Sequence, residues 1–236
     1  MVRLAAPSAA LLTLVIAGCG GGAGQASRTP GPASPSAGAT ASASPTPTSA
    51  PDTESVALVA VGLGTYLETA VPVAVVRNSA TAHSATGVRV HFAVVNPAGM
   101  TVQQTDAEVG ALAPQQTSAI AGRIDLRASG DHAVATLSVA GFSDPKPPAI
   151  TAGPAACSGC PGNGPGFGTV HAVLTAAPSA PLPPFVSATA VCYDAGGAVV
   201  GGGTTVVAPR ASGVDDPVIL SSRAVRCDMY AAPAGL

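Results

Sequence analysis

Beyond Glu54 the chain is a series of short apolar runs, and this pattern most narrowly limits the fold that it can adopt. Within each run, apolar and often β-branched side chains alternate with polar ones or stand together, as they do in β-strands. Gly, Pro, Asn and Asp separate the runs, and no long stretch has the periodicity and capping residues of a helix. The clearest runs are residues 55–61, 71–78, 87–96, 117–124 and 132–140. The sequence therefore predicts an all-β sandwich fold.

The second half of the chain repeats the pattern of the first. A shift of 98 positions aligns Val88, Phe92, Val94, Val95, Asn96, Gly99 and Val102 with Val186, Ala190, Cys192, Tyr193, Asp194, Gly197 and Val200. A period near 100 residues is the size of an immunoglobulin-like unit. We therefore expect two tandem immunoglobulin-like β-sandwich domains, residues 55–145 and 146–236, joined at the proline-rich segment 143–154.

The stretch ATAVCYDAGGAVVGGG, residues 188–203, contains three adjacent reactive side chains before a glycine run. Strand alternation turns Cys192 toward the core and Tyr193 outward, so the two cannot act on one substrate atom. Asp194 and Gly197 have the residue types of a turn. The stretch is therefore interpreted as a β-hairpin rather than as an active site or a phosphate loop.

The aligned residues resemble the FxLYD-type module of bacterial exported proteins. The first copy keeps the phenylalanine of that motif at Phe92, and the second keeps its tyrosine and aspartate at Tyr193 and Asp194. The segment VVRN, residues 75–78, is similar to the strand and asparagine that precede the motif, whereas the second copy has Ala176 where asparagine is expected. The resemblance implies a β-sandwich without catalytic activity.

The first 19 residues have the features of an export signal. Arg3 precedes an apolar core that is shorter than the roughly 20 residues needed to span a bilayer. The residues that follow, Ile16-Ala17-Gly18-Cys19, resemble a bacterial lipobox, which implies diacylglycerol transfer to the Cys19 sulfur and cleavage before it. Residues 1–18 are thus predicted to be a lipoprotein signal peptide, and the protein to be lipid-anchored at the outer face of the cell membrane.

Residues 19–54 are predicted to be a disordered tether. Between Gly20 and Thr53 they are almost entirely Ala, Gly, Ser, Thr and Pro, with no aromatic residue and no aliphatic residue larger than alanine. Such a segment cannot bury enough apolar surface to offset its chain entropy.

Four cysteines remain besides Cys19, and an even number in an exported chain suggests disulfides. Alternation places Val225, Cys227 and Met229 on one face of a strand and Cys192 on the inward face of another, so we expect a Cys192–Cys227 bridge in the core. For Cys157 and Cys160, in CSGCPG, three hypotheses are kept: a loop-closing disulfide, a redox pair, and half of a zinc site with His171.

The other candidate groups do not form a known catalytic pattern. The four histidines, His83, His91, His132 and His171, are scattered, and His91 is expected to face solvent. Asp215 and Asp216 are adjacent, which suggests a turn or loop rather than an acid–base pair with converging side chains. We therefore predict no catalytic residue, no cofactor and no metal ligand set.

Composition narrows the possible partners. Only 9% of the residues are charged and the formal net charge is −2, so the basic surface that nucleic-acid binding needs is missing. The expected function is non-covalent binding to another envelope protein or to a cell-wall polymer, without catalysis. Two alternatives are a substrate-binding lipoprotein of a transporter, which usually has two α/β lobes, and a small envelope redox enzyme using Cys157 and Cys160.

The lipid anchor can be tested directly. Cys19→Ala removes the only sulfur in the lipobox-like segment, so the protein should move from the membrane fraction to the soluble fraction. Fractionation followed by immunoblotting measures this. An unchanged membrane fraction would contradict the predicted anchor.

Overall fold

The computed structural model describes residues 55–160, 162, 164–178, 180–209 and 212–235. The predicted signal peptide 1–18 and the predicted tether 19–54, with the lipidation site Cys19, lie outside the described residues. Within the described part the regular elements are all strands. This part therefore holds no helix with the length and apolar character to cross a membrane. The predicted all-β fold is confirmed.

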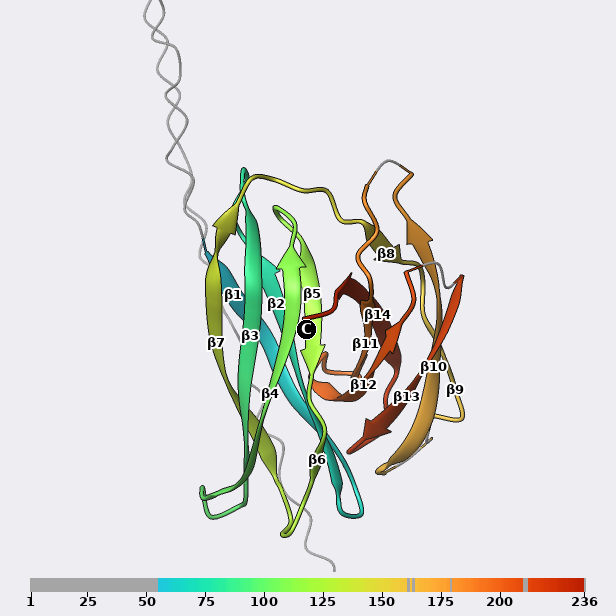
Figure 1. The fold of residues 1–236 in the computed structure, drawn as a ribbon. Coiled ribbons are helices and arrows are strands. Elements are labelled where there is room, and N and C mark those ends of the chain that lie inside the picture. The colour runs from blue at the N-terminus through green and yellow to red at the C-terminus, as the bar shows by residue number, and fades with distance from the viewer. Residues whose placement is uncertain (1–54, 161, 163, 179, 210–211, 236) are drawn as a thin grey trace, which may run out of the picture. The chain divides into compact units, whose positions relative to one another are not determined.

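The first half of the described chain forms a sandwich of two antiparallel sheets (Figure 1). One sheet has the order β1-β2-β5, with β6 also paired to β2, and the other has the order β4-β3-β7. The strands are β1 (Val56–Tyr66), β2 (Thr69–Asn78), β3 (Ser84–Val95), β4 (Thr101–Leu112), β5 (Thr117–Ala121), β6 (Ile124–Asp125) and β7 (His132–Ser143).

Side-chain alternation along β3 explains why these two sheets pack face to face. Val88, Val90 and Phe92 are fully buried, and they meet buried side chains of β2 in one apolar cluster. Arg89 and His91, on the opposite face, bind Glu108 and Asp106 of β4 at the surface. The prediction that His91 faces solvent is therefore confirmed, since 43% of its side chain is exposed.

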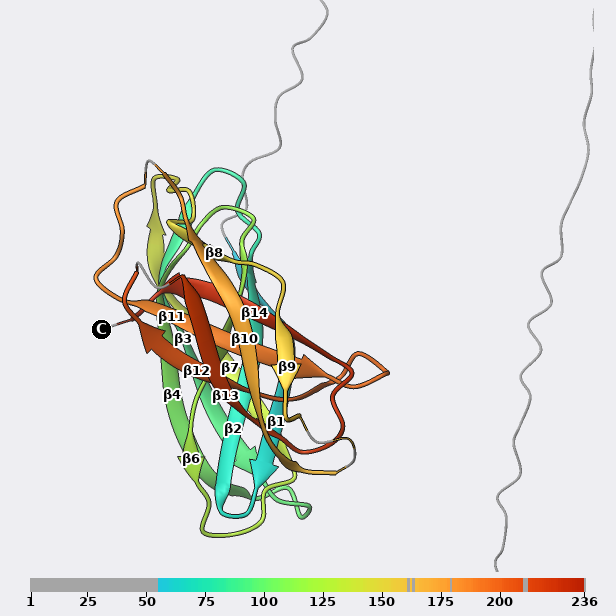
Figure 2. The same cartoon turned by 90° about the vertical axis from the view of Figure 1, so that its right-hand side faces the viewer.

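The second half forms one seven-stranded sheet with the order β14-β11-β12-β13-β10-β8, and β9 also pairs with β10. Figure 2 looks onto β8, β9 and β10 of this half. The strands are β8 (Ile150–Ala152), β9 (Ala156–Ser158), β10 (Gly166–Ala176), β11 (Val186–Tyr193), β12 (Val199–Val207), β13 (Gly213–Leu220) and β14 (Arg226–Pro233).

The two halves share one pairing scheme. β12-β11-β14 corresponds to β4-β3-β7, and β10-β13 corresponds to β2-β5. In the second half a short pairing of β12 with β13, at Gly201 and Gly202, joins the two groups into one sheet. The boundary between two domains at residues 145 and 146 stays a prediction, because all described residues belong to one compact unit.

The hairpins of the two halves agree residue by residue. Val88 lies opposite Val109 in the first hairpin, and Val186 lies opposite Val207 in the second, the same register 98 positions later. The β-bulges also correspond, between Val94 and Val95 and between Cys192 and Tyr193.

The turns of these hairpins agree as well. Asn96 Oδ1 accepts hydrogen bonds from the backbone N–H groups of the residues two and four positions later, and Asp194 Oδ1 does the same. Gly99 and Gly197 have φ of 79° and 83°, which suits glycine. The predicted hairpin at residues 188–203 is therefore present.

Glycines allow the two halves to approach closely. Gly62 and Gly64 of β1 lie against β12 and β13, where an added Cβ would collide with the carbonyl oxygens of Val199 and Ile219. Gly201 of β12 meets Gly64 with their backbones in near contact. The glycine run at residues 201–203 is therefore a packing surface between strands.

An apolar cluster beside these glycines is shared by both halves. Its buried members are Val71, Val73, Val75, Ala119, Ala121, Val191, Tyr193 and Ile219. Further along, the backbone of Val109 in β4 forms a bridge with Ala234 after β14. The C-terminal segment of the second half therefore extends the edge of a first-half sheet.

The predicted outward direction of Tyr193 is confirmed, since the side chain points away from the core of its own half. It is nevertheless only 8% exposed, because it enters the cluster shared with the first half. The predicted inward position of Val225 is wrong: Val225 is 56% exposed, because β14 begins one residue later and Val225 does not share the buried face of Cys227.

The close contact between the halves predicts that an added methyl group destabilises the protein at Gly64 but not at a glycine away from the contact. Gly64→Ala places a Cβ against the backbone of β13, so the protein should lose about 1–3 kcal/mol of unfolding free energy. Gly141→Ala in β7 is the matched control, since the nearest atom to its new Cβ would be Thr86 Oγ1 at 3.9 Å. Urea denaturation measures both variants, and equal midpoints would contradict the interpretation.

Candidate functional site

Cys192 and Cys227 face each other across β11 and β14. They are directly paired in register, with Cα atoms 4.0 Å apart and sulfur atoms at disulfide distance. Cys192 is fully buried and Cys227 nearly so, within the apolar cluster that also holds Ala188 and Ala190. The arrangement matches the expected bridge in the core of the second half.

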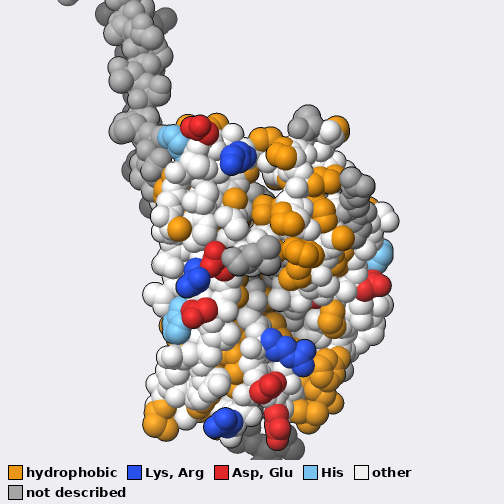
Figure 3. Space-filling model, viewed as in Figure 1, with side chains coloured by type: hydrophobic (Ala, Val, Ile, Leu, Met, Phe, Trp, Pro, Cys, Tyr) orange, Lys and Arg blue, Asp and Glu red, His pale blue; other side chains and the backbone are white. Residues whose placement is uncertain are grey.

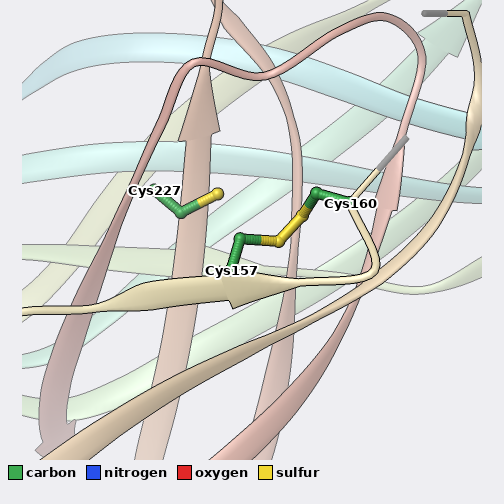
Figure 4. Close-up of side chains that lie close together, drawn as sticks. All are labelled: Cys157, Cys160 and Cys227. Carbon is green, nitrogen blue, oxygen red and sulfur yellow. A yellow bond between two sulfur atoms is a disulfide. The ribbon is translucent and has the colours of Figure 1, made fainter. Parts of the chain in front are cut away.

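Cys157 and Cys160 lie at one edge of the same half. Cys157 belongs to the short strand β9, and a turn at Gly159, with φ of 65°, returns the chain to Cys160. Their sulfur atoms are at disulfide distance (Figure 4). The pair packs onto Gly168 of β10, whose added Cβ would lie 2.6 Å from Cys160 Sγ and 3.2 Å from Cys157 Sγ.

The sulfur of Cys227 lies beside this surface pair. The sulfurs of Cys157, Cys160 and Cys227 are all within 4.8 Å of one another (Figure 4). A cavity of about 350 Å³ opens onto the three cysteines, with Arg226 in its wall. The arrangement thus places the surface pair and one sulfur of the buried pair at one cavity.

This third sulfur was missed by reasoning from the sequence. β9 pairs with β10, at the other end of the sheet order from β14, yet the fold brings β9 into contact with β14, and no residue pattern indicates that contact. His171, the ligand considered for a zinc site, instead binds Asp215 through Nδ1 at 2.8 Å on the surface. In the structure Cys227, rather than His171, is the group that joins Cys157 and Cys160.

Asp215 and Asp216 do not form a turn, so that prediction is wrong. Both belong to β13, which sends their side chains to opposite faces. Asp216 is fully buried and accepts hydrogen bonds from the Ala190 N–H at 3.0 Å and the Thr205 hydroxyl at 2.9 Å. The two carboxylates therefore do not converge on one substrate atom.

Burial raises the pKa of Asp216 from 3.8 to about 6, and the hydrogen bonds from Ala190 and Thr205 oppose this rise. Both oxygens are occupied by structural donors, and the residue is enclosed in the second half. We interpret this carboxylate as a buried structural group that fills the gap between β11, β12 and β13.

The histidines and Tyr193 do not converge on a common site in the described part of the chain. His91 and His132 each bind a surface aspartate, and His83 lies in the loop between β2 and β3. Burial raises the pKa of the Tyr193 phenol, which also hydrogen-bonds with Tyr230, so Tyr193 remains protonated at neutral pH.

A second cavity lies where the two halves meet. It has a volume of about 500 Å³, and its lining is mainly alanine, proline and isoleucine. We call this cavity the junction groove. Its lining residues are Ser84, Ala111, Ala113, Gln116, Lys146, Pro147, Pro148, Ala149, Ile150, Ala180, Pro181, Pro183, Ala231 and Pro233. Figure 3 shows hydrophobic side chains gathered on the second half and along its junction with the first.

Two polar side chains of the junction groove already serve the fold. Ser84 Oγ accepts a hydrogen bond from the Lys146 backbone N–H at 2.9 Å. Gln116 Oε1 accepts one from the Ala113 N–H at 2.7 Å. What the groove offers to a partner is therefore mainly apolar contact.

Neither a family model, nor a curated protein, nor a solved structure matches this chain.

The buried carboxylate predicts a pH dependence of stability. The folded protein holds the Asp216 proton more tightly than the unfolded chain does, so protonation stabilises the fold below the ordinary pKa. The unfolding free energy should fall by roughly 2–3 kcal/mol from this group as pH rises from about 4 through about 6.

Asp216→Asn tests this dependence because the amide can accept from Ala190 and donate to Thr205 but cannot ionise. Chemical denaturation at several pH values should show a flatter profile for Asp216→Asn. Asp144→Asn, at an exposed side chain, is the control and should keep the wild-type profile. Identical profiles for wild type and Asp216→Asn would contradict the assignment.

Proposed function

We propose that this is a lipid-anchored cell-envelope protein that binds another envelope protein non-covalently, with Cys19 carrying the anchor. The junction groove is the observation that most directly supports the binding of a partner. Its volume of about 500 Å³ is typical of ligand-binding cavities, and its lining is apolar apart from a few polar groups.

The groove suits an extended peptide. It includes Ile150 of β8, which ends the order of the seven-stranded sheet, and an edge strand can accept a partner strand through its backbone. A sugar polymer would lose hydrogen bonds from its hydroxyl groups against such a lining, which costs free energy. These features favour a protein segment over a cell-wall polymer as the bound partner.

The resemblance to FxLYD-type modules supports the same proposal. The hairpins of the two halves share register, bulge and turn, as expected of two copies of one module. Asn78, in the VVRN segment, is buried and donates to the backbone carbonyls of His83, Leu112 and Ala113. The motif residues thus serve the fold, in keeping with a binding module without catalysis.

The alternatives have less support. A transporter's substrate-binding protein usually has two α/β lobes, whereas the regular elements of the described residues are all strands. A redox role for Cys157 and Cys160 has one observation in its favour, the sulfur of Cys227 beside them.

Site-specific crosslinking in the cell tests the proposed function. A photoreactive residue at Pro181, on the exposed rim of the junction groove, should crosslink to a specific envelope protein. The same residue at Ala98, in the exposed turn of the first hairpin, is the matched control and should not. Ala180→Trp fills the groove and should reduce crosslinking from Pro181 at least severalfold.

Equal crosslinking from Pro181 and Ala98, or crosslinking from Pro181 that Ala180→Trp leaves unchanged, would contradict binding in the groove. Circular dichroism of each variant confirms that the β-fold is retained.

A further inference from the structure

The surface cysteine pair and Cys227 of the buried pair line one cavity. The pair on β9 and its turn is at the surface, whereas Cys192 is fully buried and Cys227 is 8% exposed. Cys227 is the link between them, because its sulfur lies within 4.8 Å of both surface sulfurs and at disulfide distance from Cys192. A loop-closing disulfide alone does not require such a contact.

We propose that Cys157 and Cys160 form a thiol–disulfide exchange site, through which an external protein dithiol or disulfide controls the redox state of the buried Cys192–Cys227 bridge. The site goes beyond the proposed binding function and does not depend on it.

The first step is exchange with the partner dithiol. A partner thiolate attacks a sulfur of the Cys157–Cys160 disulfide, this bond breaks, and the other cysteine leaves as a thiolate. The second thiol of the partner, once deprotonated, then attacks the partner's other sulfur, the one held in the mixed disulfide, and releases the cysteine of this protein as a thiolate. The partner departs as a disulfide, and Cys157 and Cys160 have received two electrons and, with their thiolates protonated, two protons.

The second step is internal. A thiolate of the surface pair attacks Cys227 Sγ, the Cys192–Cys227 bond breaks, and Cys192 takes up a proton as it leaves. The second surface thiolate then closes on the first, which releases Cys227 and restores the Cys157–Cys160 disulfide. The buried pair is reduced and the surface pair is reoxidised, and an external disulfide drives the same steps in reverse.

The surroundings assign different roles to the two pairs. The cavity gives a partner access to Cys157 and Cys160. Cys192 is fully buried among Ala188, Ala190 and other apolar side chains, and Cys227 is only 8% exposed. A large reductant should therefore reach the surface pair more readily than the buried bridge.

Variants in which one cysteine of the surface pair is replaced should trap the intermediate of the internal step. In Cys160→Ser, the remaining Cys157 thiolate should attack Cys227 and free Cys192; Cys157→Ser should do the same through Cys160. The full chain is purified in detergent, alkylated, digested without reduction and examined by mass spectrometry.

The expected products are a peptide pair linked through Cys227 and an alkylated Cys192, both increasing from pH 7 to pH 9 as thiolate forms. The double variant Cys157→Ser/Cys160→Ser is the matched control and should keep Cys192 protected. A protected Cys192 in both single variants at pH 9 would overturn the proposal.

A rate measurement covers the case in which a single variant folds poorly. Wild type and the double variant are exposed to reduced thioredoxin as the probe dithiol protein, and alkylation of Cys192 is followed over time. Wild type should lose the buried bridge at least tenfold faster than the double variant, with Cys157 and Cys160 reduced first. Equal rates would overturn the proposal, since the surface pair would then have no part in reduction of the bridge.

Discussion

The arrangement of this protein depends on a close backbone contact between its two halves. Gly62 and Gly64 of β1 have no side chains, so β12 and β13 approach until carbonyl oxygens of the second half occupy the space that a Cβ would take. This approach buries Tyr193 and Ile219 against β2 and β5. The junction groove likewise includes residues of both halves and of the segment that connects them.

The second half keeps the pairing scheme of the first but fills its core differently. At corresponding positions of β3 and β11, Val90 and Phe92 are replaced by Ala188 and Ala190, so less apolar surface is buried. A bridge from Cys192, closing a separation of 35 residues, would contribute about 4 kcal/mol in the chain-entropy model and offset part of that loss. The buried carboxylate of Asp216 fills further space in the same half through hydrogen bonds.

The sequence was sufficient for the features that depend on local pattern. Alternation and turn residues predicted the strands, the hairpin at 188–203 and the inward direction of Cys192, because these follow from strand geometry within one hairpin. Contacts between distant strands could not be predicted in the same way. The burial of Tyr193 could not be predicted because it comes from the other half, and Asp216 looked like a turn residue because its hydrogen-bond donors lie on β11 and β12.

The cysteine site also depends on contacts between distant strands that the sequence did not predict. Each cysteine pair could be proposed from spacing or alternation, but the approach of Cys227 to Cys157 and Cys160 depends on where β9 pairs with β10. The groove at the junction likewise exists only because the halves pack together, and proline-rich segments alone did not indicate a cavity. Single-strand patterns therefore predicted the elements, whereas both candidate sites arise from packing between elements.

The central claim, that the two halves form one unit across the glycine contact, is tested most directly by hydrogen exchange of the full chain at increasing urea concentration, read out by mass spectrometry of peptides. The account predicts that peptides from β3 and β11 lose protection at the same urea midpoint, and that the peptide containing Gly62 and Gly64 is protected up to that midpoint. Separate midpoints for β3 and β11, together with rapid exchange at Gly62 and Gly64 in the absence of urea, would contradict it.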